Sequence, residues 1–449
     1  MRSNGGQLFP ESIMAEIKRR FHYVDHDVDG RARLFFDNAG GSFRLKSVLE
    51  AFAQVDALPD CPERIHERAL VLQDIQTRGE DDIRRILNAR DGSVYLSLTA
   101  SAAMFEMVRA VMENVPGTNA VTTILEHPSS FDAMTLYCER TGKTLRVAPS
   151  NAETGGVDVD AIVSLIDGDT ALLSVMYASN ISGAKLDIAA IVERARARKP
   201  DIFIIVDAVQ HAPHAVIDLQ KTPVDGINLA PYKFFGCRGA GVAWLSERLA
   251  ELPHHRLAAK EKGVWELGSP APAHFAVVSS IVDYVAWIGA QSSDAEDRRE
   301  LFVQGMRRIE EHERALLSLL LDGVGGQHGL RAIEGVRVFW DHDDLTQRDL
   351  IAGIGFDGLD PTAAVRAYEE RGVVVYERIA TSLYSGRMLK SFNLGGAVRI
   401  SPLHCHAPSD VARFLAVSED IAITSRLQPD GLRPPSASSA AGTLRRCRS

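Results

Sequence analysis

The chain has few cysteines, no excess of basic residues and no evident membrane-spanning run. Its net charge of -9 argues against the basic face of a general nucleic-acid binder, so we expect no nucleic-acid partner. No apolar run is expected to reach the roughly 20 residues that span a bilayer, and the first residues lack the apolar segment of a signal peptide. We therefore expect no membrane partner. The five cysteines lack metal-ligand spacing, so we expect no metal site and a reducing cytoplasm: Cys61, Cys138, Cys237, Cys405 and Cys447.

The chain is long enough for one large domain and a smaller one, with 449 residues, 45% hydrophobic and 24% charged. Strand-like and helix-like segments alternate over residues 93–245, which predicts an α/β domain with a mostly parallel sheet. After that stretch the pattern predicts a compact α+β unit. The predicted parts are an N-terminal helical segment (1–30), a large domain (31–290), a small C-terminal domain (291–427) and a disordered Pro/Ser/Ala-rich tail (428–449).

One stretch organises the large domain. The β-branched and aromatic run 202–206 predicts a strand buried on both faces, and it ends at Asp207, with Gln210 and Lys233 following. A lysine in an apolar pocket has a lowered pKa and can form a Schiff base with an aldehyde. A buried carboxylate can keep a pyridine nitrogen protonated. The alternative is an ordinary aspartate at a strand end with a surface lysine.

A second candidate feature follows the predicted strand 93–98. Thr99, Ala100 and Ser101 separate this strand from a helical pattern. Free N–H groups at the start of a helix, together with the helix dipole, favour an anion such as a phosphate. Thr99 and Ser101 can equally be plain N-caps.

Three further features lie where predicted strands end. His127 follows the strand 119–125 and could stack on a flat ring, although a histidine at a strand end is more often structural. Asn180 follows the strand 170–176 and could donate to a ligand oxygen, or it could serve the turn alone. The small residues Asn38, Ala39 and Gly40 would let the backbone approach a ligand closely, or would simply form a turn.

These features share one edge of the predicted sheet, because ligand groups collect at the carboxyl ends of parallel strands. Jointly they describe a phosphate seat, a stacking ring, a hydroxyl partner, a pyridinium partner and a Schiff-base lysine. That set matches pyridoxal 5'-phosphate.

The order of the motifs resembles the class V aminotransferase family, particularly its cysteine desulfurase-like members. The motifs are Asp-Asn-Ala, Glu-His-Pro, Ser-Asn-x-x-Gly, Asp-Ala-x-Gln and Tyr-Lys-Phe-Phe-Gly, spread over about residues 30–425. The resemblance implies the pyridoxal-phosphate-dependent fold type I, with a mainly parallel seven-stranded sheet in the cofactor-binding large domain. It also implies a homodimer with shared active sites and a small amino acid as substrate.

The resemblance also assigns roles to residues. Lys233 would form the Schiff base with the cofactor and act as the base, and Asp207 would pair with the ring nitrogen. His127 would stack on the ring, while Asn180 and Gln210 would contact its 3'-oxygen. The cofactor site would further include Thr99, Ala100, Ser101, Tyr232 and Ser269, the last reaching the phosphate in a neighbouring subunit. Asn38, Ala39, Gly40 and Arg399 would contact the substrate, with Arg399 binding its α-carboxylate or, alternatively, being only a strand-end charge.

Two departures from the family pattern bear on the reaction. Many members have Ser at the position of Ala230 and His at that of Tyr232, both used for phosphate. A desulfurase needs a nucleophilic cysteine some residues before the carboxylate arginine, and residues 371–398 contain none. Neither Cys237 nor Cys405 occupies that place, which argues against persulfide transfer.

The sequence therefore predicts a pyridoxal-phosphate enzyme that cleaves a C–S bond through an external aldimine, as a lyase or a desulfurase-like enzyme. An aminotransferase or epimerase needs the same core residues and is the alternative reaction. A non-catalytic scaffold with a degenerate cofactor site is the alternative of another class. A nucleotide-binding oxidoreductase is disfavoured because no Gly-x-Gly-x-x-Gly follows an early strand.

Overall fold

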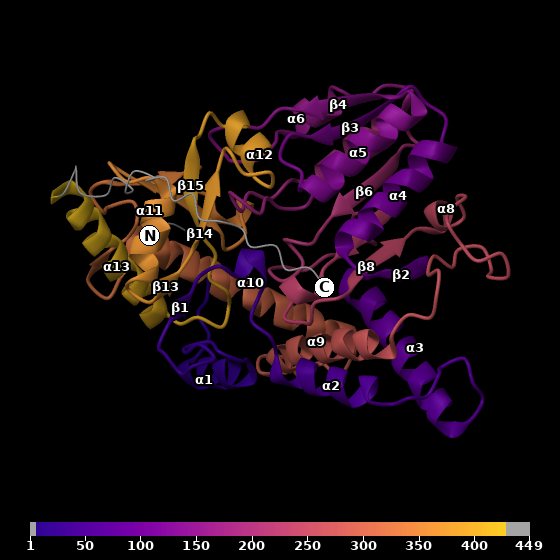
Figure 1. The fold of residues 1–449 in the computed structure, drawn as a ribbon, viewed down its shortest axis with the longest axis horizontal. Helices are drawn as coiled ribbons and strands as arrows, with labels where there is room; N and C mark the ends of the chain where they lie inside the picture. The colour runs from indigo at the N-terminus through magenta and orange to yellow at the C-terminus, as the bar shows by residue number, and fades with distance from the viewer. Residues whose placement is uncertain (1–5, 428–449) are drawn as a thin grey trace, which may run out of the picture.

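A seven-stranded sheet lies at the centre of the larger part of the molecule (Figure 1). The computed structural model describes residues 6–427, so the predicted disordered tail lies outside the described residues. All neighbouring strands are parallel except β8, which runs antiparallel to both of its neighbours. The predicted α/β fold with a mainly parallel sheet is confirmed. In spatial order the strands are β2 (Ser93–Ser97), β8 (Gly241–Leu245), β7 (Gly226–Leu229), β6 (Phe203–Asp207), β5 (Thr170–Met176), β3 (Asn119–Thr123) and β4 (Thr144–Ala148).

Helices cover both faces of this sheet, as the alternation of its buried side chains requires. On β6, Phe203 and Ile205 pack into the cluster formed with α4 (Ala100–Asn114), α5 (Pro128–Thr141) and α8 (Glu247–Ala250). Ile204 and Val206 point the other way, into the main core. That core includes side chains of α1 (Glu11–Arg20), α2 (Lys46–Asp56), α3 (Glu67–Leu87), α6 (Val159–Val163), α7 (Ile188–Arg198), α9 (Pro272–Ala290) and the first half of α10 (Arg298–Asp322).

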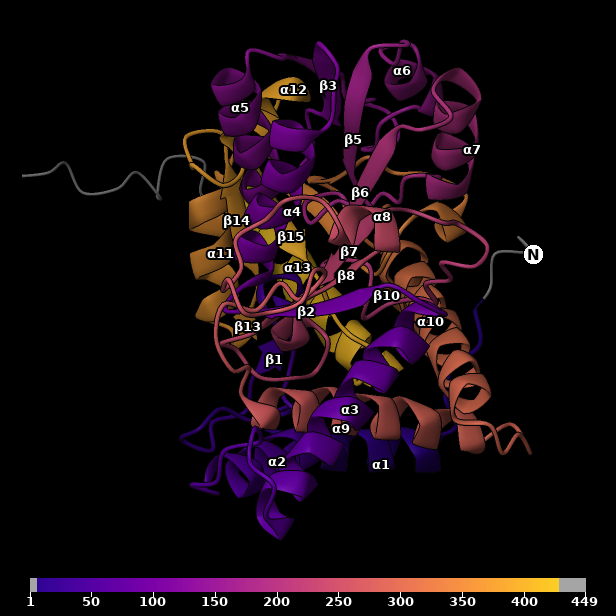
Figure 2. The ribbon, with the colours of Figure 1, turned by 90° about the vertical axis from the view of Figure 1, so that its right-hand side faces the viewer.

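Helix α9 corrects one expectation from the sequence. By length and composition it is apolar enough to cross a membrane, although no such run was expected. Its most apolar window is 67% buried, and α2, α3 and α10 pack against it (Figures 1 and 2). Because protein already covers most of its surface, α9 has the properties of a core helix.

The smaller part of the molecule is an antiparallel four-stranded sheet covered by helices. In spatial order its strands are β11 (Val336–Phe339), β12 (Ala352–Phe356), β15 (Gly396–Ile400) and β14 (Tyr376–Ile379). Its core contains side chains from the second half of α10, from α11 (Pro361–Glu369) and from α13 (Pro408–Leu427). The remaining elements are the short strands β9 (Gly323–Val324), β10 (Gln327–His328) and β13 (Val373–Val374), the helix α12 (Gly386–Ser391), and the 3-10 turns η1 (Asn38–Gly40), η2 (Pro231–Lys233) and η3 (Leu345–Gln347).

The N-terminal segment contributes to both parts. Met14 and Ile17 of α1 pack in the main core, whereas Leu34 of β1 (Leu34–Phe35) packs in the core of the small sheet. β1 pairs in parallel with β13, with Leu34 opposite Val373. Strand β1 therefore packs with the C-terminal part of the chain. The predicted domain boundaries stay a prediction.

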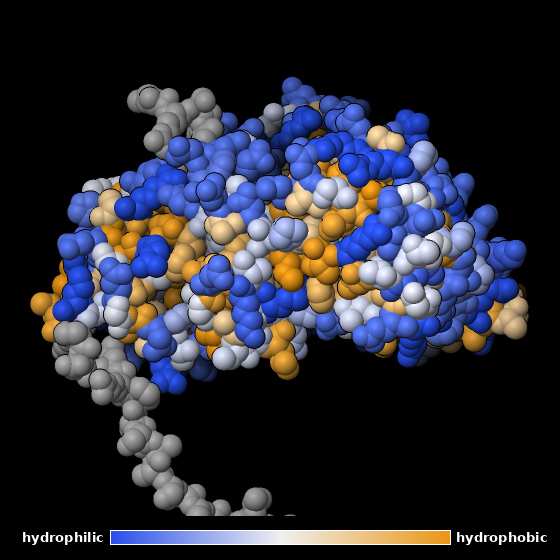
Figure 3. All heavy atoms as spheres, turned by 90° about the horizontal axis from the view of Figure 1, so that it is seen from above, coloured by the Kyte–Doolittle hydropathy of each residue, from blue (hydrophilic) through white to orange (hydrophobic). Residues whose placement is uncertain are grey.

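Apolar side chains are not spread evenly over the surface. Seen from above in Figure 3, hydrophobic side chains gather near the middle of the face and again towards its left, whereas hydrophilic side chains cover most of the right. The site described next lies where the larger and the smaller part of the molecule meet.

Candidate active site

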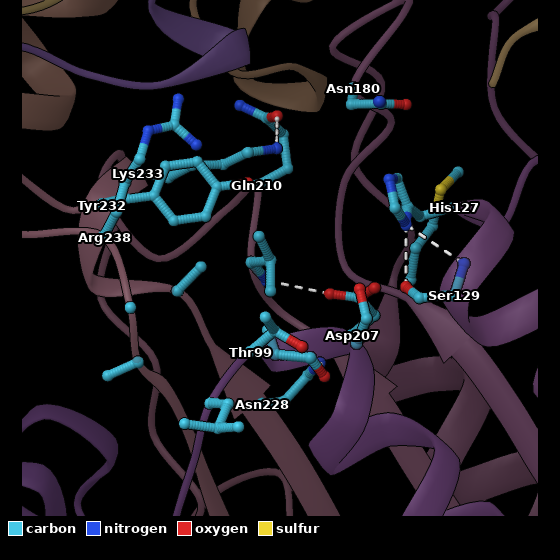
Figure 4. A pocket seen from close by; sticks show the side chains of 18 of the residues that line it. Thr99, His127, Ser129, Asn180, Asp207, Gln210, Asn228, Tyr232, Lys233 and Arg238 are labelled. Carbon is cyan, nitrogen blue, oxygen red and sulfur yellow. Dashed lines mark hydrogen bonds between the residues drawn. The ribbon is translucent and has the colours of Figure 1, made fainter. Parts of the chain in front are cut away.

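A cavity of about 350 Å³ opens at the carboxyl ends of β2, β3, β5, β6 and β7 (Figure 4). This is the edge at which an α/β sheet collects ligand groups. Nine of the predicted site residues line it together: Thr99, Ala100, Ser101, His127, Asn180, Asp207, Gln210, Tyr232 and Lys233. The structure thus brings most of the candidates to one place, while their individual roles stay predictions.

Lys233 is the buried amine of this cavity, 8% exposed at the end of η2. Burial, helped by the positive charge of Arg399, lowers its pKa to about 8. Its Nζ donates a hydrogen bond to Gln210 Oε1 at 3.3 Å. A substantial fraction of the amine is therefore neutral near pH 8, which is the form that attacks an aldehyde.

Asp207 is the buried carboxylate at the end of β6. Burial raises its pKa, while the backbone N–H of Val209 (3.1 Å to Oδ1) and the charge of Lys233 oppose the shift. A buried carboxylate of this kind is stabilised by any cation that joins it. A protonated ring nitrogen would be such a cation.

His127 presents a neutral ring to the cavity. Burial and the charge of Lys233 lower its pKa to about 4. Its Nδ1 accepts the backbone N–H of Ser129 at 3.2 Å and lies 2.7 Å from the Ser129 hydroxyl, so His127 caps α5. Because Nδ1 is an acceptor, the ring proton is on Nε2. A flat uncharged ring held by its cap can stack on a flat ligand.

The start of α4 forms the predicted phosphate seat. Thr99 Oγ1 accepts the N–H of Ala102 at 3.0 Å, so Thr99 is the N-cap of α4, and it also lines the cavity. The N–H groups of Ala100 and Ser101 have no acceptor within the helix, because the first turn of a helix has no preceding turn to supply carbonyl groups. A Cβ on Gly241 would lie 2.0 Å from the nitrogen of Ala100, so only glycine lets β8 pass this close to the turn.

The two departures from the family pattern, Ala230 and Tyr232, line this cavity as well. The guanidinium of Arg238 lies 4.5 Å from the centre of the Tyr232 ring, and Arg238 also lines the cavity. Arg238 was not predicted as a site residue, although it lies in the glycine-rich turn after Lys233. It supplies positive charge at the rim, beside the position where the family pattern has histidine.

Five predicted site residues lie outside the cavity lining: Asn38, Ala39, Gly40, Ser269 and Arg399. Asn38 uses its Nδ2 to bind the carbonyls of Phe35 and Ser401, each at 3.2 Å. The N–H of Ala39 donates to Ser401 Oγ at 3.0 Å, and Gly40 lies beside Arg399. Ser269 is exposed and binds Glu63. Within the described residues, then, Asn38 and Ala39 serve to join η1 to the end of β15.

Arg399 approaches the site from the small sheet. It is 3% exposed and forms an ion pair with Asp37, whose Oδ1 lies 2.5 Å from Nη2. Its Nη1 donates to the carbonyl of Asn180 at 3.0 Å, which ties the small sheet to the large one. Arg399 is therefore a buried guanidinium whose charge acts on the pKa of Lys233, and its binding of a substrate carboxylate stays a prediction.

Sequence reasoning missed three buried residues at this site. Asn228 lines the cavity and its Nδ2 donates to the carbonyl of Ala100 at 3.1 Å, which holds the start of α4 against β7. Burial raises the pKa of Glu126 to about 8, so its carboxyl group is largely protonated at neutral pH. Arg378, on β14, places a positive charge near Lys233 and His127. Glu126 was visible beside His127, whereas nothing local marked the other two.

None of the cysteines in the described part of the chain lines this cavity. Cys237 and Cys405 are both buried, and burial raises the pKa of each thiol. Neither side chain lines the cavity. Both thiols are protonated at neutral pH, which is the unreactive form.

Comparisons with known proteins agree with this geometry. The sequence model of class V aminotransferases matches residues 34–414. A cysteine desulfurase of Cronobacter sakazakii is 24% identical over 361 residues, covering 74% of this chain and 81% of that protein. A probable cysteine desulfurase of Streptomyces coelicolor is 28% identical over 304 residues, covering 61% of this chain and 71% of that protein.

Solved structures with the same fold include two cysteine desulfurases. The S-sulfonic acid form of the enzyme from Escherichia coli superposes with a TM-score of 0.75 at 20% identity, covering 93% of this chain and 99% of that one. The apo enzyme from Thermococcus onnurineus gives a TM-score of 0.78 at 17% identity, covering 94% of this chain and 100% of that one. At this identity the likeness shows the shared fold alone.

Proposed function

From the premise that this chain belongs to the class V aminotransferase family and is a pyridoxal-phosphate-dependent enzyme, we propose that it cleaves a C–S bond in a small amino acid. One observation carries the proposal. Lys233, with its lowered pKa, shares a single buried cavity with the carboxylate of Asp207 and the neutral ring of His127. An amine, an acid and a flat ring in this arrangement are the groups that the cofactor needs.

The residues of the cavity fit pyridoxal 5'-phosphate. Lys233 Nζ would bind its aldehyde as a Schiff base, with water as the leaving molecule. Asp207 would hold the ring nitrogen, His127 would stack on the ring, and the first turn of α4 would hold the phosphate. When bound, the cofactor supplies an electron sink for the bonds at Cα of the substrate.

The chain's own residues would then position the substrate and move a proton. Arg399 would bind the α-carboxylate in place of, or beside, its present partner Asp37. Lys233, freed by the substrate amine, would remove the proton from Cα as general base. A neutral Lys233 is needed for this step, which its burial favours.

The choice of β-elimination over persulfide transfer depends on the cysteines. Residues 371–398 contain none, and the thiols of Cys237 and Cys405 are buried outside the cavity lining. In elimination the sulfur leaves with the electron pair of the C–S bond and takes a proton, so no protein thiol is required. An aminotransferase or epimerase would use the same residues around Lys233.

Product analysis tests this proposal. Purified enzyme loaded with cofactor would be incubated with cysteine, cystine and cysteine S-conjugates, and sulfide, thiol and pyruvate would be measured. Release of sulfide or thiol with pyruvate supports the lyase. A loaded enzyme that forms keto acid without losing sulfur would support the aminotransferase instead, and one that turns over nothing would support a scaffold.

A homodimer and a cytoplasmic location are part of the proposal. Leu98 lines the cavity yet is 81% exposed, and Leu267, two residues before Ser269, is 55% exposed. A second copy that covers these side chains would bury apolar surface and close the cavity. Light scattering of the purified protein would measure its mass, and a monomer would contradict the shared site.

The low pKa of Lys233 predicts how cofactor uptake depends on pH. The amine reacts in its neutral form, and its pKa is lowered from 10.5 to about 8. Uptake by cofactor-free enzyme should therefore accelerate roughly fivefold from pH 7 to 8 and level off above about pH 9. Stopped-flow absorbance measures the rate, with N-acetyl-lysine as the unperturbed control. A rate that rises tenfold per pH unit to about pH 10 would show an ordinary lysine.

A further inference from the structure

Two buried arginines project from the same face of the small sheet. Tyr376 is the register partner of Arg399, and Arg378 is the partner of Ala397. The intervening side chain, Val398, belongs to the core on the opposite face, with the helices α11 and α13. Because side chains alternate along a strand, Arg378 and Arg399 share the face that meets the large sheet, where Arg399 binds Asn180.

The two guanidinium groups differ in their partners. Arg399 has an ion pair with Asp37 and a hydrogen bond to the carbonyl of Asn180. The side chain of Arg378 is 6% exposed and has no hydrogen bond or ion pair within residues 6–427, and its Nε is buried without an acceptor. The guanidinium of Arg378 contacts the ring of Tyr376. The centre of that ring lies 5.5 Å from Cζ of Arg378 and 5.4 Å from Cζ of Arg399.

An unpaired cation at this depth is unfavourable for the fold. Taking a guanidinium out of water is costly unless an anion or several acceptors replace the water. Burial and the nearby charge of Arg399 lower the pKa of Arg378 to about 9, which reflects that cost. A bound anion would relieve it, since it would compensate the charge that the fold leaves uncompensated.

The position of Arg378 suggests which anion this is. Arg378 shares the ring of Tyr376 with Arg399, and its positive charge acts on both Lys233 and His127. The phosphate seat at α4 lies elsewhere on the cavity wall, at Thr99, Ala100 and Ser101. The α-carboxylate is assigned to Arg399. A second acidic group on the substrate remains as the partner for Arg378.

We propose that Arg378 binds a carboxylate or sulfinate in the substrate's side chain, so that the enzyme selects acidic amino acids. This inference rests on the proposed function, because it takes Arg399 as the site of the α-carboxylate. Cysteine sulfinate and S-carboxymethylcysteine satisfy both requirements, since each has a C–S bond and a second anionic group. Arg378 is then a specificity-determining residue.

Ligand binding to the cofactor-loaded enzyme tests the proposal with pairs that differ only in charge. The pairs are L-aspartate with L-asparagine, and S-carboxymethylcysteine with its carboxamide. Cysteine sulfinate is measured separately and tests the sulfinate group. The wild type should bind each acid at least about tenfold tighter than its amide. In Arg378→Gln the two should bind about equally, and Arg378→Lys should keep part of the preference.

The matched control is Arg337→Gln, which removes a 69% exposed arginine from β11 of the same sheet and should keep the full preference. Equal binding of acid and amide by the wild type would overturn the inference. An equal loss of binding affinity for acids and for amides in Arg378→Gln would also overturn it, since Arg378 would then bind the α-carboxylate that both ligands share. A large fall in the melting temperature of that variant would indicate a structural role and also overturn it, because removing an unpaired buried charge should leave stability unchanged or higher.

These outcomes are separate from failure of the proposed function. If the wild-type protein takes up no cofactor, the proposed function fails before any amino acid is added. If it takes up the cofactor and binds acids and amides alike, only the role of Arg378 is wrong. If Arg378→Gln weakens the binding of aspartate but not that of cysteine sulfinate, the second group is a carboxylate.

Discussion

Replacing Lys233 by alanine should lower kcat by roughly 10³- to 10⁴-fold and remove the visible absorption band of the lysine-bound cofactor. The expected loss is large because the side chain is proposed both to hold the cofactor and to move the proton at Cα. Both roles need an amine at this position with a pKa near neutrality, and Lys233 is the amine that lines the cavity. Absorbance spectra and steady-state rates measure the two effects.

Lys221→Ala is the matched control, since the side chain of Lys221 is 79% exposed and pairs with Asp218 on the surface. That variant should keep both the band and the rate. Within residues 6–427 the side chain of Lys233 makes one hydrogen bond, to Gln210, so its alanine variant should remain folded and retain cofactor non-covalently. A Lys233→Ala variant that keeps near wild-type turnover would refute its role as the base.

Replacing Asp207 by asparagine should lower kcat by roughly 10²- to 10³-fold, with the band retained. The two side chains have nearly the same shape, so the change removes the charge and leaves the backbone contact to Val209 possible. Without the carboxylate a protonated ring nitrogen would be a buried cation without its partner, which costs about 3–5 kcal/mol. The cofactor would then be a poorer electron sink.

Steady-state kinetics and the titration of the bound cofactor measure this effect. Asp160→Asn serves as the control, because the side chain of Asp160 is 83% exposed and pairs with Arg194 at the surface. Thermal unfolding of the cofactor-free protein should show Asp207→Asn to be at least as stable as the wild type, since a buried carboxylate with a raised pKa is lost. Activity within a few-fold of the wild type would mean that Asp207 does not hold the ring nitrogen.

Much of the fold could be predicted because its strands are continuous and bounded by clear turns. The run 202–206 is uniformly apolar, and the structure buries all of β6 on both faces. Asp207 could be chosen because it ends this run, and Lys233 because aromatic residues and a glycine-rich turn flank it. Strand β7 was missed because its four residues, Gly226–Leu229, are too few to show a period. Asn228, which lies on β7, was missed with it.

The remaining site residues depend on packing between segments far apart in the chain. Arg378 and Arg399 belong to neighbouring strands, and only their register shows that they share a face. The salt bridge between Arg399 and Asp37 joins residues that are 362 positions apart. Glu126 is protonated at neutral pH because tertiary packing buries it completely. Local sequence reports neither register nor burial, so these features could not be derived from it.

The most direct test of the central claim, that Lys233 carries the cofactor, is to trap the bond chemically. Borohydride reduction of the loaded enzyme converts the Schiff base into a stable secondary amine, and mass spectrometry of its peptides locates the added group. The account predicts the reduced cofactor on the peptide that contains Tyr232 and Lys233. A label on any other lysine, or none on an enzyme that has cofactor bound, would contradict it.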